Sequence, residues 1–102
     1  MVNVPKGDYG YYLNFIVQKS DGTAYDLTGY TITLKVWRAG SPDILIMSGA
    51  CDIVTAASGI CKYLVASGDF DDLGRYEAEL ELTKVDVKES TKTFEIIVKE
   101  SG

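Results

Sequence analysis

A chain of 102 residues suits one folded domain and leaves no room for a second of ordinary size. Its apolar fraction of 46% and charged fraction of 25% exclude a disordered chain. Fifteen acidic residues against ten basic ones give a formal charge of −5, which would repel a phosphate backbone, so nucleic acid is not an expected partner. We expect a single domain over residues 1–102, with its core between about residues 8 and 99.

The first residues contain no basic stretch that leads into an apolar block, so the sequence predicts synthesis in a cytoplasm without a signal peptide. The longest unbroken aliphatic run, from Ile44 to Met47, has four residues, whereas a membrane-spanning helix needs about 20. A membrane is therefore not an expected partner.

Two strands are predicted in the first third of the chain, over residues 13–17 and 31–36, because apolar and polar residues alternate there. By the same parity, Tyr12 and Trp37 fall on the polar faces of these strands. Large amphipathic side chains that stand out from a sheet are typical anchors for a protein partner, so both are candidate interface residues. The alternative for Trp37 is that it folds over the end of the sheet beside Pro42.

Three weaker runs in the middle of the chain, residues 44–48, 51–54 and 60–65, are rich in β-forming residues. A hairpin turn at residues 55–59 that pairs Val54 with Ile60 would set Ile53 opposite Cys61. Cys51 would then lie diagonally from Cys61 on the same face. Two reduced, buried thiols are one outcome, and a disulfide formed after a slip in register is the other.

The strongest alternation runs from Arg75 to Leu82, where apolar residues take every even position and charged residues every odd one. A helix over residues 72–88 is the rival, because several of its apolar residues also fall near helical spacing. That helix would hold Gly74 in its first turn and would turn Leu82 and Val85 toward solvent. With a further alternating run at residues 93–98, an all-β chain is the consistent interpretation.

A short motif stands directly before this strand, with the D-x-G-x-Y form of the tyrosine corner in immunoglobulin-like sandwiches, and its defining residues are Asp72, Gly74 and Tyr76. Gly74 permits the sharp path of the chain, and the hydroxyl of Tyr76 would satisfy an upstream backbone group. An ordinary turn before a half-buried tyrosine is the alternative. The position two residues after the tyrosine, where antibody-type domains carry a bridging cysteine, is Ala78. We therefore predict an immunoglobulin-like antiparallel β-sandwich of seven or eight strands without an inter-sheet disulfide.

The order of these elements resembles one family, the N-terminal domain of phage baseplate upper proteins. The similar segments are a strand at residues 9–17, a D-G turn and an L-T-G step within residues 21–29, and a strand at 31–37, followed by a hairpin at 48–63, the strand start at 73–80 and the closing strand at 93–98. The resemblance covers about residues 8–99. It implies an immunoglobulin-like module in the virion that helps to assemble the host-adhesion device of a tailed phage. The implied partners are other virion or tail proteins, or further copies of the chain.

Catalytic and metal chemistry find little support in the residues. The chain has no histidine, so a nucleophilic triad would need another base. The glutamates of residues 77–81 alternate on the wet face of one strand, which is typical of a solvated surface and not of a glycosidase cleft. The aspartates of residues 69–72 could hold Ca²⁺ in a loop, but a turn that they cap accounts for them without a metal. We predict no enzyme, no cofactor and no metal site.

A second function stays open at this point. Carbohydrate-binding modules are also β-sandwiches, and they stack sugar rings on exposed aromatic side chains. The chain has seven tyrosines and one tryptophan, more than a core of this size needs. Tyr12 and Trp37 are the candidate stacking platforms, and a glycan is the alternative partner.

Overall fold

The computed structural model describes residues 2–101, and within them the chain forms eight β-strands, one short 3-10 turn and no α-helix. The elements are β1 (Val2–Pro5), β2 (Tyr12–Ile16), β3 (Thr31–Arg38), β4 (Leu45–Thr55), η1 (Ala56–Ser58), β5 (Ile60–Leu64), β6 (Gly74–Lys84), β7 (Val87–Ser90) and β8 (Phe94–Lys99). The all-β prediction is confirmed. Strands β6 and β7 occupy the stretch for which a helix was the rival.

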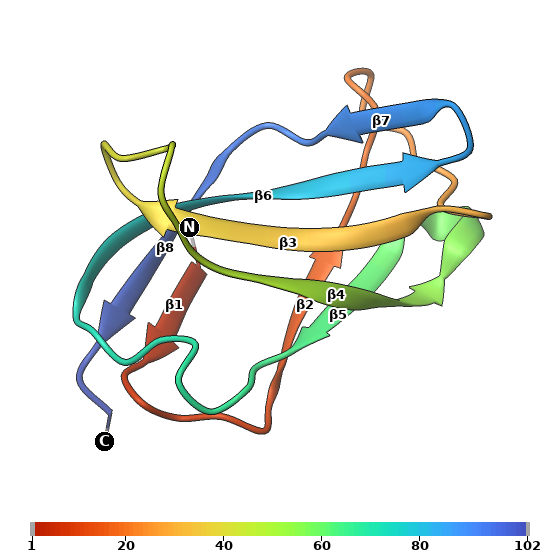
Figure 1. Cartoon of the computed structure of the whole chain (residues 1–102). Helices are drawn as coiled ribbons and strands as arrows, with labels where there is room; N and C mark the ends of the chain where they lie inside the picture. The colour runs from red at the N-terminus through yellow and green to blue at the C-terminus, as the bar shows by residue number, and fades with distance from the viewer. Residues whose placement is uncertain (1, 102) are drawn as a thin grey trace.

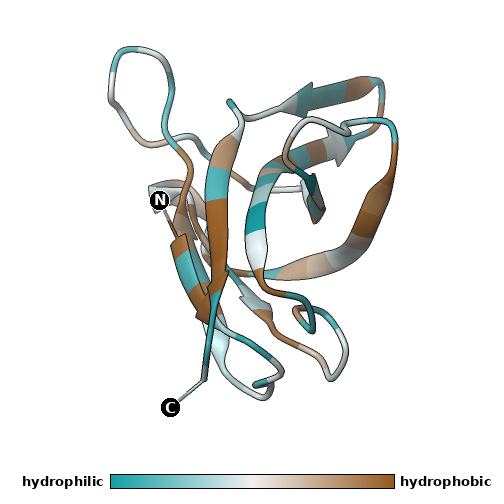
Figure 2. Cartoon of the chain, turned by 90° about the vertical axis from the view of Figure 1, so that its left-hand side faces the viewer, coloured by the Kyte–Doolittle hydropathy of each residue, from teal (hydrophilic) through white to brown (hydrophobic). Residues whose placement is uncertain are grey.

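The strands form one curled sheet in the order β1-β8-β6-β3-β4-β5-β2, with β7 also beside β6 (Figure 1). Strand β4 makes the curl, because its first half pairs with β3 and its second half with β5. It thereby passes from one layer to the other, and Figure 2 shows the sheet wrapping around its interior. The rings of Phe15 in β2 and Phe94 in β8 lie 5.5 Å apart, so strands from opposite parts of the order face each other. The result is a sandwich-like fold.

The central pair of the sheet, β3 and β6, carries the apolar core. Each of the predicted inward residues on these strands is buried, and they oppose one another in register as Ile32 with Leu82, Leu34 with Leu80 and Val36 with Ala78. Burial of each large side chain contributes about 1.5 to 3 kcal/mol to stability. The alternation in the sequence therefore predicted both the strands and the faces that they bury.

Two short strands were not predicted, and one of them changes the topology. Strand β1 pairs in parallel with β8, so the sheet is mixed and the expectation of a wholly antiparallel arrangement is wrong there. Val4 of β1 is buried in the core, which therefore begins before residue 8. Strand β7 is mostly polar and forms because the chain folds back tightly after β6, with Asp86 at a positive φ of 62°.

The hairpin that carries the two cysteines forms largely as predicted. Ile53 lies opposite Cys61, and Gly59 takes the left-handed conformation at the end of the turn. A register shift lets Thr55 pair with Ile60, so the predicted pairing of Val54 with Ile60 is wrong. Both cysteines are free thiols, so the structure has the reduced form and not the disulfide that was the second predicted outcome. A hydrogen bond with Cys61, together with burial, raises the pKa of the Cys51 thiol.

The tyrosine corner has the hydrogen bond that the motif predicts. The hydroxyl of Tyr76 donates to the backbone carbonyl of Asp72 at 2.9 Å and accepts from the guanidinium of Arg38 at 3.1 Å. Gly74 has a φ of 138°, a backbone angle that residues with a Cβ rarely adopt. The buried ring of Tyr76 and its satisfied hydroxyl thus join β6 to the loop before it and to the end of β3.

We expect Tyr76→Phe to lower the free energy of unfolding by about 1 to 2 kcal/mol, because the variant leaves the Asp72 carbonyl and the Arg38 guanidinium without their partner. Urea denaturation followed by circular dichroism would measure this change. Tyr9→Phe is the matched control, since Tyr9 is exposed and outside the strands. Equal midpoints for the two variants would show that the corner hydroxyl adds no stability.

In the folded protein at pH 8, we also expect both thiols to react with a disulfide reagent at least about tenfold more slowly than a free cysteine does. Cys61 is fully buried, and the raised pKa of Cys51 keeps it protonated at that pH. Complete reaction of both thiols should follow addition of denaturant. Rapid modification of Cys61 before unfolding would contradict its burial, and rapid modification of Cys51 would contradict its raised pKa.

Candidate protein-interaction surface

The two predicted interface residues have different surroundings. Tyr12 is 43% exposed on β2, as its parity predicts. Trp37 is only 5% exposed, so its predicted exposure is wrong. It lies on the outer face of β3 between Leu45 of β4 and Glu77 of β6, its cross-strand neighbours. A large ring on a central strand is flanked by side chains on both sides, whereas Tyr12 stands on a strand with one neighbour only.

The backbone of β2 is hydrogen-bonded along one side only, because β5 is its one partner strand. Val17 donates its N–H to the carbonyl of Gly59, and the carbonyl of Tyr11 accepts from Val65, so the odd-numbered residues of β2 face β5. In an antiparallel ladder the alternate residues point their N–H and C=O groups the other way. The free edge of β2 therefore presents the backbone groups of residues 12, 14 and 16.

The outward side chains of β2 and β5 form an apolar surface beside this edge. The register sets Tyr12 opposite Leu64 and Ile16 opposite Ile60, all on the same face of the sheet. Ile16 is 68% exposed and Leu64 is also exposed. We call these four residues the Tyr12 face. The ammonium of Lys62 lies 4.0 Å from the centre of the Tyr12 ring and covers one side of it.

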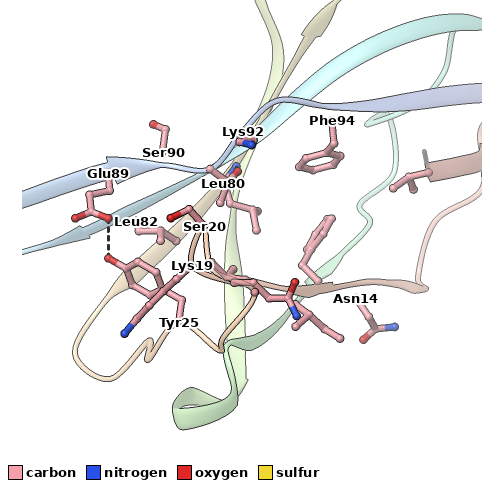
Figure 3. A pocket seen from close by; sticks show the side chains of 17 residues that line it. Asn14, Lys19, Ser20, Tyr25, Leu80, Leu82, Glu89, Ser90, Lys92 and Phe94 are labelled. Carbon is pink, nitrogen blue, oxygen red and sulfur yellow. Dashed lines mark hydrogen bonds between the residues drawn. The ribbon is translucent and has the colours of Figure 1, made fainter.

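A groove of about 820 Å³ lies on the other side of β2, where the free edge meets β6, β7 and β8 (Figure 3). The apolar part of its lining comes from Phe15, Leu80, Leu82 and Phe94. The hydroxyl of Tyr25, which also lines the groove, donates to the Glu89 carboxylate at 2.8 Å, shown as a dashed line in Figure 3. We call this space the β2 groove.

The net charge of the residues that line the β2 groove differs in sign from the net charge of the whole chain. Its lining contains Lys19 and Lys92 against Glu89, a sum of +1, whereas the chain carries −5. Glu89 is the residue that accepts the hydrogen bond from Tyr25. The lining of the groove thus carries a net charge of +1 on an acidic domain.

The acidic segments considered for metal or catalytic chemistry have structural partners. The Asp69 carboxylate accepts from the hydroxyl of Tyr63 at 2.5 Å and from the backbone N–H of Ala66 at 2.9 Å, so it caps a turn. Glu81 pairs with Lys35 at 2.5 Å, and this contact lowers the pKa of the Glu81 carboxyl. Within residues 2–101 the structure contains no group of three or more potential metal-ligating side chains. No helix in that part of the chain is long and apolar enough to cross a membrane.

Sequence reasoning found Tyr12 but missed the free edge and the groove. The available signal was the absence of charge and proline from residue 10 to residue 18, which is unusual for an edge strand. This signal could not be read as an edge, because the sequence does not state which strands pair.

Comparisons with known proteins agree with this architecture. The chain is similar to a solved structure described as the N-terminal domain of phage TP901-1 ORF48, with a TM-score of 0.74 and 20% sequence identity over 98% of this chain and 85% of that one. At that identity the likeness shows a shared fold. A search of curated proteins found no match. The profile of the BppU N-terminal domain matches residues 2–102. The chain therefore belongs to the family of BppU N-terminal domains, the N-terminal domains of phage baseplate upper proteins.

Proposed function

We propose that this domain is a non-enzymatic structural module of a phage tail or baseplate, located in the virion and acting through contacts with other virion proteins. Membership of the baseplate upper protein family supports the location in a phage tail or baseplate. The observation that carries the proposal is the Tyr12 face, an apolar surface next to a strand edge with free backbone groups. Such a surface offers a protein partner both apolar area and hydrogen bonds.

The grouping of these side chains matters more than their individual exposure. Single exposed apolar residues are normal on protein surfaces, whereas contiguous patches mark sites of interaction. In the Tyr12 face, two apolar cross-strand pairs lie on adjacent strands, one on each side of the polar pair Asn14 and Lys62, and Tyr12 is an aromatic residue of the kind enriched at the centres of interfaces. A partner that covers this face would remove the apolar surface from water.

We do not propose the carbohydrate-binding alternative for this surface. Of its two candidate stacking platforms, Trp37 is buried. The remaining candidate platform, the ring of Tyr12, already has the ammonium of Lys62 against one of its sides. A sugar ring would have to compete with that contact.

We expect Tyr12→Ala to weaken binding to the partner tail protein by about 5- to 30-fold, the usual range for truncating an aromatic anchor. The test would mix the domain with purified tail and baseplate proteins from the same phage and measure affinity by isothermal titration calorimetry. Tyr9→Ala removes an exposed tyrosine outside the strands and should change the affinity little. The absence of any complex with these proteins at tens of micromolar would contradict the proposed function.

A further inference from the structure

We infer that the free edge of β2 receives an extended strand from a partner protein, with apolar side chains at alternate positions entering the β2 groove and an acidic residue meeting its lysines. This inference rests on the proposed function, because it specifies how and by what chemistry the assembly partner is held.

The first support is the state of the backbone along the β2 edge. Tyr12, Asn14 and Ile16 point their N–H and C=O groups away from β5, and within residues 2–101 no other strand pairs with β2. An extended segment beside them would satisfy these groups by continuing the sheet. Natural edges are usually blocked by charge, by proline or by a bulge, and residues 12–16 carry none of these.

Two other edge strands, β7 and β1, show the usual protection. Strand β7 has two charged residues, Lys88 and Glu89, among its four, and β1 is a short strand that ends at Pro5. The first half of β4, which has a free side where it pairs only with β3, is also uncharged. Strand β2 contributes Asn14, Phe15 and Ile16 to the lining of the groove, whereas β1 contributes Val2 alone and β4 contributes no residue. Strand β2 is therefore the edge where side-chain pockets accompany the backbone groups.

The second support is the shape of the site. Successive side chains of a strand point to opposite faces, so every second residue of an added strand would point between the layers. There it would meet Phe15, Leu80 and Phe94 in the β2 groove (Figure 3). The volume of about 820 Å³ is large enough for several apolar side chains. The remaining side chains of the added strand would extend the Tyr12 face.

The third support is charge, which favours an acidic partner over a second copy of this chain. Among residues 2–101, neither Lys19 nor Lys92 has a carboxylate oxygen within 4.0 Å, in contrast to Lys35 and Lys88. Hydrogen bonds from Thr23 and Thr28 keep the carboxylates of Asp21 and Asp26 charged, and Lys19 lies close enough to both to lower their pKa as well, so Lys92 is the groove lysine that is left for a partner. A second copy that paired its own β2 here would bring its lysines with it. A partner strand with an acidic residue would complement them.

The backbone part of the inference is tested with Asn14→Pro and its matched control Asn14→Ala, using the tail protein bound in the experiment above. Proline removes the outward N–H, and it is tolerated on the free side of an edge strand, whereas alanine keeps the N–H and removes only the side chain. We expect binding to fall at least about tenfold for proline and to be retained for alanine. Circular dichroism and the thermal midpoint would establish that both variants fold.

A second pair of variants keeps the test decisive if the proline variant does not fold. Lys92→Glu reverses a charge in the lining of the β2 groove and leaves the Tyr12 face unaltered, and Lys99→Glu makes the same change at an exposed lysine at the end of β8 that does not line the groove. We expect Lys92→Glu to weaken binding of the acidic strand by at least about fivefold and Lys99→Glu to leave it unchanged. The partner segment would then be located with overlapping 12-residue peptides of the tail protein, and the peptide that binds should alternate apolar residues and contain Asp or Glu.

The outcomes separate this inference from the proposed function. Unchanged binding by Asn14→Pro, or by Lys92→Glu where the proline variant does not fold, would overturn the acidic partner strand and leave the assembly role intact. If no tail protein binds the unaltered domain, the proposed function fails and this inference fails with it. Self-association of the domain that Asn14→Pro abolishes and Asn14→Ala retains would make the occupant a second copy, and binding of a glycan in the β2 groove would make it a sugar; either result would overturn an acidic partner strand.

Discussion

The pairing of β3 with β6 is the contact on which the rest of the fold depends. These are the longest mutually paired strands at the centre of the sheet, and their inward residues form the largest continuous part of the core. Strand β6 holds β8 and β7 on its other side, and β3 holds β4, so both layers are attached through this pair. The tyrosine corner adds a second connection, because Tyr76 on β6 contacts Arg38 at the end of β3 through its hydroxyl.

The free edge of β2 follows from the way β4 changes layers. Because β4 leaves β3 and continues beside β5, the second layer contains only the end of β4, β5 and β2, and nothing remains to pair with β2. The curl then brings Phe15 of β2 against Phe94 of β8 while leaving the β2 groove between them and β7. The edge and the groove thus have one cause, a sheet whose two ends approach without hydrogen-bonding.

Tyr12 and Trp37 show how far the sequence could predict the site. Parity placed both on outer faces, and both do lie there, but β3 is central and β2 is an edge strand, so only Tyr12 is exposed. Alternation shows which face of one strand is apolar, but it does not show which strands lie beside that strand. The same limit explains β1, whose four residues are too few to show a period and whose parallel pairing joins the two ends of the chain. Local features such as the tyrosine corner and the cysteine hairpin were predictable because their partners are close in sequence.

An uncharged edge strand is a liability for an isolated domain, because it invites pairing with any exposed strand that it meets. The chain protects β7 with charged residues and β1 with a proline, so its sequence is able to block an edge. The open edge of β2 is therefore consistent with the partner strand that we infer there. The net charge of +1 in the groove lining, on a domain of net charge −5, favours an acidic residue in that strand. Selectivity and protection from aggregation would then come from the same few residues.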